Sequence, residues 1–222
     1  EEQLLVGGAG DRDEAPPHTA AAWQQVSIPT RECPGVSRCP FGGECFVERS
    51  RESARTADLI VTNHALVAIN AMHGGTALPE HDALIIDEAH ELMGRLTTAA
   101  TGELSAGVAE RVVKRCLAWL DDELGGDLLD AVEELHDALA DSPTGRITGV
   151  DVPLPVACAG LRDASRRAIS DLGKDRDNPE RSQAAGALGE IFDISERIAR
   201  LADQDVVWVS RSDGIGETAH VA

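Results

Sequence analysis

Aromatic side chains and lysines are scarce in this sequence of 222 residues. Aromatic residues make up 3% of it, tyrosine does not occur, and Lys114 and Lys174 are the only lysines. Acidic residues outnumber basic ones by 39 to 20, which gives a formal net charge of -19. This balance argues against a basic protein whose whole surface neutralises nucleic-acid phosphates, although it leaves room for a local basic site.

Long apolar runs are also missing. No stretch approaches the ~20 apolar residues of a membrane span, and the first ten residues, EEQLLVGGAG, lack the basic end and apolar core of a signal peptide. We therefore expect no membrane association and a cytoplasmic location. Because the first residue is Glu1 rather than Met, and a Gly-rich and Pro-rich run soon follows, we interpret the sequence as a piece of a longer protein.

Two short apolar runs stand out in the first half of the chain. Residues 59–62 and 83–86 are continuously apolar or β-branched, and each run leads into a helical pattern. A further polar helix is predicted over residues 46–57, and residues 26–28 form a weaker strand-like patch. Buried strands that alternate with helices indicate pieces of a parallel α/β sheet.

Helical spacing dominates beyond Gly102. Four apolar stripes predict a bundle of amphipathic helices. The stripes consist of Leu104, Val108, Val112, Cys116 and Trp119; of Leu128, Val132, Leu135 and Leu139; of Cys158, Leu161, Ser165, Ala168 and Leu172; and of Ala187, Ile191, Ile194, Ile198 and Leu201. Residues 206–210 and 217–222 then predict a hairpin that leaves the bundle. Residues 121–141 hold nine acids and no Lys or Arg, as a solvated helix face would.

The second apolar run ends in Asp87-Glu88-Ala89-His90. In nucleoside triphosphatases an Asp at the end of a buried strand holds Mg²⁺ beside the phosphate-binding loop. A neighbouring Glu can activate the attacking water, which would assign metal binding to Asp87 and catalysis to Glu88. Two acids at a helix N-terminus, where the macrodipole favours them, are the alternative. A zinc-peptidase motif is excluded, because it needs a histidine where Gly94 stands.

A phosphate-binding loop of the form G-x-x-x-x-G-K-[ST] is absent from the sequence. Neither lysine is followed by Ser or Thr. The chain alone cannot form a complete ATP site of that type.

Cys33, Cys39 and Cys45 are spaced C-x5-C-x5-C, with Pro and Gly between them. Such clustering favours a metal or iron–sulfur site over disulfides in a chain without a secretion signal, and unrelated free thiols are the alternative. Three thiolates are one short of the usual four, so we expect the fourth ligand upstream of Glu1. Cys116 and Cys158 lie on apolar helix faces, where a thiol acts as a small hydrophobe.

The order of these motifs is a Cys triplet, ADLIVTNHAL, ALIIDEAH and then a helical region. In this order the sequence resembles, over nearly its whole length, the DinG branch of the XPD-like iron–sulfur helicases of superfamily 2. ALIIDEAH is similar to the Walker B motif of that family, and ADLIVTNHAL is similar to its Asn-His segment.

The resemblance implies an α/β fragment of a RecA-like motor domain, with a cysteine-rich iron–sulfur segment and a mostly α-helical arch insertion. The implied parts are the later iron–sulfur domain in residues 1–46, the DEAH-bearing part of the first motor domain in 47–102, the arch in 103–205, and a return toward the motor in 206–222.

The resemblance also implies cofactors and site residues. The cofactors are a 4Fe-4S cluster on Cys33, Cys39 and Cys45, together with ATP and Mg²⁺. His90 would couple hydrolysis to movement. Asn63 and His64 would lie near the nucleic-acid path, although an Asn-His pair at a strand end can equally be a structural cap.

The intact protein would then be an ATP-dependent helicase that unwinds DNA in the 5′ to 3′ direction. Its partners would be single-stranded and forked DNA, and we expect a monomer in the cytoplasm, associated with the nucleoid. The alternative is a non-enzymatic module, in which a zinc-binding knob and a helical bundle dock a protein partner. That alternative leaves a strand ending in DEAH unexplained.

Overall fold

The structure is a computed structural model, and it describes residues 15–19, 22–23, 27–28, 32–33, 35–72, 75, 77–175, 178–212 and 216–222. The chain divides into two compact units, Glu1–Leu96 and Thr97–Ala222. Each unit is described by itself below. Of the strand-like patch predicted at 26–28, Val26 lies outside the described residues, and residues 27–28 are not in a strand.

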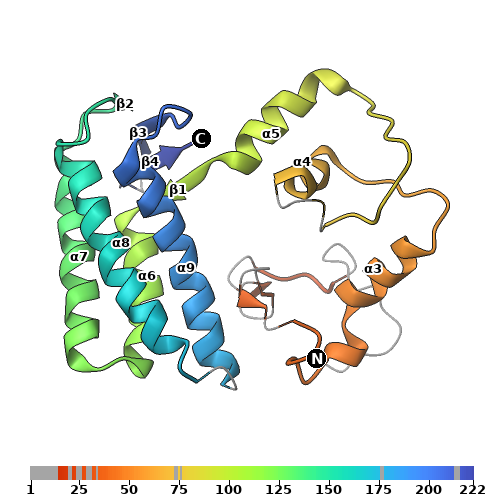
Figure 1. Cartoon of the computed structure of the whole chain (residues 1–222), viewed down its shortest axis with the longest axis horizontal. Helices are drawn as coiled ribbons and strands as arrows, with labels where there is room; N and C mark the ends of the chain where they lie inside the picture. The colour runs from red at the N-terminus through yellow and green to blue at the C-terminus, as the bar shows by residue number, and fades with distance from the viewer. Residues whose placement is uncertain are drawn as a thin grey trace. The chain divides into compact units, whose positions relative to one another are not determined.

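Short helices make up the described regular structure of the first unit. They include η3 (Gly42–Glu44), α3 (Phe46–Arg55), α4 (His64–Met72) and η4 (Ala89–Glu91), followed by α5 (Leu92–Ala100), which runs on into the second unit (Figure 1). The predicted polar helix after the cysteines is α3, and the apolar helix after Asn63-His64 is α4. Both predictions are therefore confirmed.

The two strands predicted in the first unit are wrong. Residues 59–62 and 83–86 pair with no strand among the described residues. Their apolar side chains are open to solvent, with Leu59 80% exposed, Val61 90% and Ile85 93%. An apolar run favours burial, but a strand also needs neighbouring backbones to take up its hydrogen bonds, and the described part of this chain places none beside either run. The parallel sheet predicted from these runs is likewise absent from the described residues.

The second unit is a helical bundle with a small sheet (Figure 1). Its helices are α6 (Ala106–Cys116), η5 (Leu117–Trp119), α7 (Asp122–Asp141), α8 (Pro153–Leu172) and α9 (Pro179–Arg200). Its strands are β1 (Gly102–Leu104), β2 (Gly145–Ile147), β3 (Val207–Ser212) and β4 (Gly216–Val221). The four helical stripes therefore predicted four real helices, although Leu104 belongs to β1 rather than to the first helix.

Side-chain caps begin three of these helices. The Ser105 side chain accepts a hydrogen bond from the Val108 amide at the start of α6, and the Asp121 side chain accepts one from Leu124 in α7. In α9, the Asn178 side chain accepts from two backbone amides, and Pro179 follows in the first turn. These caps satisfy amides that have no partner within the helix.

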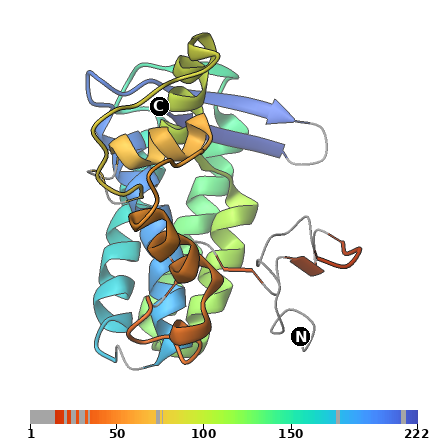
Figure 2. The same ribbon diagram turned by 90° about the vertical axis from the view of Figure 1, so that its right-hand side faces the viewer.

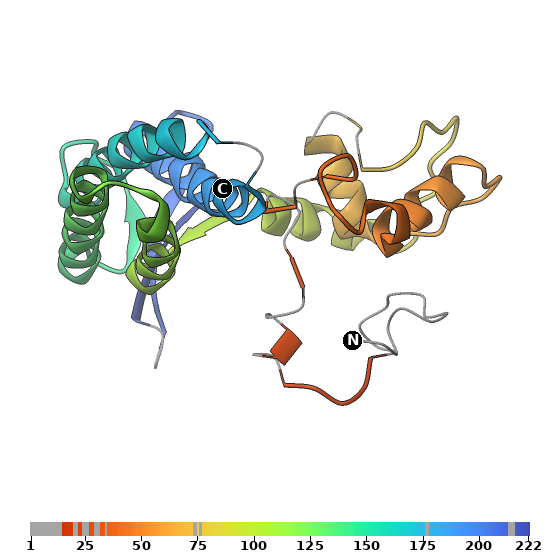
Figure 3. The ribbon, with the colours of Figure 1, turned by 90° about the horizontal axis from the view of Figure 1, so that it is seen from below.

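One core joins the helices to the sheet. Its fully buried large residues include Leu128, Leu135, Leu161, Leu188, Ile198, Val207 and Val209. Helices α6, α7, α8 and α9 lie side by side in the views of Figures 2 and 3. Burying each large aliphatic side chain contributes ~1.5–3 kcal/mol, so this core accounts for the compactness of the unit.

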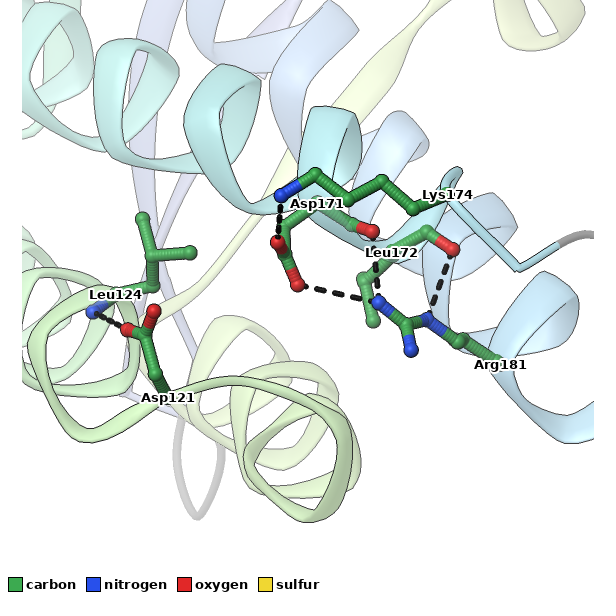
Figure 4. A network of polar contacts seen from close by, with 6 residues as sticks. All are labelled: Asp121, Leu124, Asp171, Leu172, Lys174 and Arg181. Carbon is green, nitrogen blue, oxygen red and sulfur yellow. Dashed lines mark hydrogen bonds and ion pairs between the residues drawn. The ribbon is translucent and has the colours of Figure 1, made fainter.

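Helices α8 and α9 run antiparallel and are joined by polar contacts at the middle of α8 and at its C-terminal end. The Arg162 guanidinium lies 3.2 Å from the Glu196 carboxylate. At the C-terminal end of α8, Arg181 donates to the backbone carbonyls of Leu172 (2.9 Å) and Asp171 (2.7 Å), and its guanidinium also contacts the Asp171 carboxylate, as Figure 4 shows. The Lys174 ammonium, 2.6 Å away, lowers the pKa of Asp171 by donating a hydrogen bond to it.

The sheet is antiparallel, with strand order β1-β4-β3-β2. The predicted terminal hairpin is confirmed as β3 and β4, although residues 213–215 between them lie outside the described part. The prediction that this hairpin leaves the bundle is wrong, because Val207, Val209, Ala219 and Val221 lie in the same core as the helices. Two short strands from distant segments, β1 and β2, pair with the edges of this hairpin. The hydrophobic pattern of the sequence does not reveal such pairing.

The first and last strands of the unit are direct neighbours. Gly102 in β1 pairs with Val221 in β4. A Cβ atom at Gly102 would approach Ile194 Cγ1 of α9 to 2.9 Å, so glycine allows this close contact. The chain therefore enters and leaves the helical unit at the same place.

Candidate functional site

The predicted DEAH motif lies in an exposed turn at the start of η4. Glu88 adopts a left-handed backbone conformation, with φ 47° and ψ 45°, which is uncommon for a residue with a side chain. The Asp87 carboxylate accepts a hydrogen bond from the Glu88 amide at 2.9 Å, and the Glu88 carboxylate lies 3.3 Å from His90 Nδ1. The turn therefore gathers the three predicted polar residues at one exposed point.

Asn63 and His64 have different roles in the structure. The Asn63 side chain accepts a hydrogen bond from the Leu66 amide at 2.9 Å, so it caps α4. His64 Nε2 lies 2.8 Å from the backbone carbonyl oxygen of Asp87. The structure thus brings the Asn-His segment to the DEAH turn, a contact across 23 positions of sequence that no pattern in the sequence indicates.

The carboxylates of Asp87 and Glu88 are both exposed. Carboxylate oxygens suit Mg²⁺, which keeps several waters and often binds through one or two carboxylates and substrate phosphates. No group of three or more His, Cys, Asp or Glu side chains within the described residues could hold a metal ion. The DEAH carboxylates therefore fit a magnesium ion that is held mainly by phosphate and water, and do not form a protein cage.

The cysteine segment folds as a series of tight turns. The Cys39 amide donates to the Gly35 carbonyl at 3.0 Å, and the Gly42 amide donates to the Cys39 carbonyl at 3.0 Å. A Cβ at Gly42 would lie 2.2 Å from the Val36 carbonyl oxygen, so only glycine permits this closure. Two of the predicted ligands, Cys39 and Cys45, therefore flank one compact loop.

The three predicted cluster ligands are free thiols. Cys33 is exposed, and Cys39 and Cys45 are partly buried. Thiolates are the donors that iron–sulfur clusters use, so the residue type fits. The arrangement does not, because the thiols do not form a metal-holding group among the described residues.

The arginines that follow the cysteines interact locally along α3. Arg51 pairs with Glu48 at 2.7 Å and Arg55 pairs with Glu52 at 2.6 Å. The Arg49 guanidinium lies over the Phe46 ring, 4.7 Å from its centroid. All of these contacts lie within α3, which is an exposed polar helix without buried residues.

The acidic run at 121–141 forms α7. Asp121 caps this helix, and Asp127 pairs with Arg167 of α8 at 2.6 Å. The other acids of the run are exposed, so the interpretation as a solvated helix face is confirmed.

A polar cluster on the outer face of the sheet was not predicted. The Trp208 and His220 rings stack, with centroids 5.0 Å apart and planes within 7°. His220 also contacts the Ser210 hydroxyl at 2.8 Å and the Glu103 carboxylate at 3.6 Å. The alternation in both strands would have placed these side chains on one face, but the pairing of β1 with β4 was needed to bring Glu103 there.

No family model matches the chain. The ATP-dependent helicase DinG of Mycobacterium tuberculosis is 44% identical over 144 residues, which cover 64% of this chain and 22% of that protein. The chain is related to the DinG helicases. DinG of Photobacterium profundum is 28% identical over 247 residues, 90% of this chain and 34% of that protein. The ATP-dependent DNA helicase YoaA of Escherichia coli is 39% identical over 75 residues, 32% of this chain and 12% of that protein.

The DinG-like chain therefore spans about a fifth of the length of the mycobacterial relatives. In the described part of the chain no helix is long and apolar enough to cross a membrane.

Proposed function

We propose that this DinG-like chain is part of an ATP-dependent DNA helicase. The observation that carries the proposal is the 44% identity, over 144 residues, to a protein named as an ATP-dependent helicase. The exposed DEAH turn supports it, because its carboxylates are accessible to a nucleotide and its metal. Substrates, on this proposal, are ATP with Mg²⁺ and single-stranded or forked DNA, unwound in the 5′ to 3′ direction by a monomer that acts at the nucleoid.

Within this function, Asp87 is the residue that holds Mg²⁺, and Glu88 orients and activates the attacking water. Phosphoryl transfer depends chiefly on positioning and on neutralising charge, so two fixed carboxylates suffice for these roles once a phosphate loop holds the triphosphate. His90, whose Nδ1 lies 3.3 Å from the Glu88 carboxylate, would respond to changes at that side chain and couple hydrolysis to movement through other motifs.

The helical unit is proposed to be the arch inserted in the first motor domain. Its support is the pairing of Gly102 with Val221, because an insertion whose two ends are neighbours can be accommodated without separating the strands of its host. The compact core of the unit is consistent with the same interpretation.

Cys33, Cys39 and Cys45 are proposed as ligands of a 4Fe-4S cluster, with a fourth ligand elsewhere in the protein. When bound, the cluster would tie the loop at Cys39–Cys45 to more distant parts of the chain. Among the described residues the three thiols do not form a metal-holding group, so the remaining parts of the protein would have to bring them together.

A strand-separation assay on the full-length protein tests this function. A forked duplex with a 5′ single-stranded tail should be unwound only when ATP and Mg²⁺ are present, and a fork with only a 3′ tail should not be unwound. Iron and acid-labile sulfide are measured on the same anaerobically purified sample. Absence of unwinding, together with zinc and no sulfide, would instead favour the zinc-binding docking module.

A further inference from the structure

The peptide group that joins Asp87 to Glu88 is held at both of its polar atoms. Its carbonyl oxygen lies 2.8 Å from His64 Nε2, and its N–H donates to the Asp87 carboxylate at 2.9 Å. A peptide group is planar, so fixing both atoms fixes the plane. Because the Cα atoms of Asp87 and Glu88 both lie in this plane, the directions of both side chains depend on it.

His64 is itself held by the helix on which it stands. It is the first residue of α4, and Asn63 caps that helix through the Leu66 amide. A carbonyl oxygen only accepts hydrogen bonds, so Nε2 must carry the proton in this contact. The imidazole therefore acts as a rigid donor from one segment to the backbone of another.

The backbone conformation of Glu88 suggests what the hydrogen bond from His64 to the Asp87 carbonyl does. A left-handed backbone is disfavoured at a residue with a side chain and persists only where the surroundings enforce it. The hydrogen bond from His64 lies on the peptide that immediately precedes this residue. It is thus placed to keep Glu88 in a conformation that the free chain would avoid.

We propose that His64 is a positioning residue of the ATP site, which orients the carboxylates of Asp87 and Glu88 through the peptide between them. This inference rests on the proposed function and deepens it. It assigns His64 to the nucleotide side rather than to direct contact with nucleic acid, since its Nε2 is already bonded to the DEAH turn. Movement of α4 would then alter the geometry of hydrolysis.

The test compares His64→Ala with His64→Gln in the full-length protein. Glutamine carries an N–H donor at the same number of bonds from Cα, so it can restore the hydrogen bond that alanine removes. We expect His64→Ala to lower kcat for ATP about 10- to 100-fold, because misdirected carboxylates stabilise the transition state less well and so raise the barrier. The KM for ATP should change less than threefold, and His64→Gln should recover most of the rate. His81→Ala is the matched control, because His81 contacts only the nearby Pro79 carbonyl in the described structure and should retain full activity.

Glu88→Gln separates failure of this inference from failure of the proposed function. If Glu88→Gln abolishes hydrolysis while His64→Ala is normal, the positioning role is wrong and the helicase proposal stands. If His64→Ala and His64→Gln are equally impaired, the side-chain N–H at position 64 does not account for the loss of activity, and the inference is again overturned. An active Glu88→Gln protein would contradict the proposed function itself.

A second measurement on the 222-residue chain is independent of catalysis. The ¹³C chemical shift of the Asp87 carbonyl reports the hydrogen bond it accepts. It should move in His64→Ala and return toward the original value in His64→Gln, with resonances of α7 unchanged. An Asp87 shift that is identical in all three proteins would show that the contact does not form.

Discussion

At the residue scale, the buried thiols differ chemically from the cysteines of the first unit. Burial raises the pKa of Cys116 to about 11 and that of Cys158 to about 12, from an ordinary value of 9.0. Only thiolates react readily. Iodoacetamide at pH 8 should therefore modify Cys33, Cys39 and Cys45 in the native chain and leave Cys116 and Cys158 unmodified, as peptide mass spectrometry would show. Labelling of Cys158 at the rate of Cys33 would contradict the burial.

The same shifts predict how stability depends on pH. Since the folded-state pKa of Cys158 lies above its ordinary value, the unfolded chain loses the proton first as pH rises. The contribution of this thiol is fully present below pH 9.0 and is lost as pH rises through about 12. Urea unfolding between pH 8 and 10.5 should show a shallower decline for Cys158→Ala than for the original chain. Equal slopes would count against the prediction.

Two serines inside the bundle test the cost of a buried hydroxyl. Ser165 and Ser195 are fully buried, and their hydroxyls have no hydrogen-bond partner among the described residues. An unsatisfied buried polar group costs ~1–3 kcal/mol. Ser195→Ala should therefore raise the free energy of unfolding by ~1 kcal/mol.

Ser142 provides the matched control for this substitution. It is also buried, but its hydroxyl donates to the Ala138 carbonyl, so Ser142→Ala should lower the free energy of unfolding by ~0.5–1.5 kcal/mol. Chemical denaturation of both variants measures the difference. The same sign for both changes would mean that hydrogen bonding does not distinguish the two sites.

At the element scale, Arg197 joins the segments at which the helical unit begins and ends. Its guanidinium donates to the Ala100 carbonyl at the end of α5 (3.0 Å) and to the Asp205 carboxylate after α9 (2.8 Å). Arg197→Met should lower the free energy of unfolding of the unit by ~1.5–3 kcal/mol, since the hydrogen bonds involve charged groups and Asp205 loses its partner.

Arg200→Met is the control for this element. Arg200 is exposed and pairs with the partly buried Glu196 one turn earlier on the same helix, and pairs four residues apart on a helix contribute only ~0.3–0.5 kcal/mol. Urea denaturation compares the two variants. Equal losses of stability would show that Arg197 is no more than another surface charge.

The elements differ in how far the sequence predicts them. Helices α6 to α9 could be predicted because each has its own apolar stripe, and capping residues such as Asp121 and Asn178 mark where two of them begin. Strand β1 could not be predicted, because three residues are too few to show an alternation of apolar and polar side chains. Its partner β4 also lies more than 100 positions away in the sequence. Residues 59–62 and 83–86 have the composition of strands, but the neighbours that would pair with them are not found in the described chain.

In the candidate site, too, some features can be predicted from the sequence and others cannot. Asp87, Glu88 and His90 are recognisable because the motif is continuous, whereas the contact of His64 with the Asp87 carbonyl joins two segments and involves a backbone atom. No residue type marks a backbone acceptor. The Cys33, Cys39 and Cys45 cluster stays a prediction from spacing and resemblance.

At the scale of the whole molecule, the helical unit should behave as an independent domain. Residues 97–222 form one compact unit with a single core. Produced alone, this segment should unfold in one cooperative transition by circular dichroism and bind single-stranded DNA poorly, because the acids of α7 repel phosphate and few cations are available for counterion release. Tight, salt-sensitive binding in a fluorescence anisotropy titration would contradict the second expectation.

The central claim is that Asp87 and Glu88 serve an ATP site. The most direct measurement compares Mg²⁺-dependent ATP hydrolysis and ATP binding in the full-length protein and its Glu88→Gln and Asp87→Asn variants. Glu88→Gln removes the charge that activates water and should abolish turnover while ATP still binds with nearly the original Kd. Asp87→Asn removes the carboxylate that holds the metal, and should also weaken the Mg²⁺-dependent part of binding. Hydrolysis by Glu88→Gln at a near-normal rate would show that these acids only begin a helix.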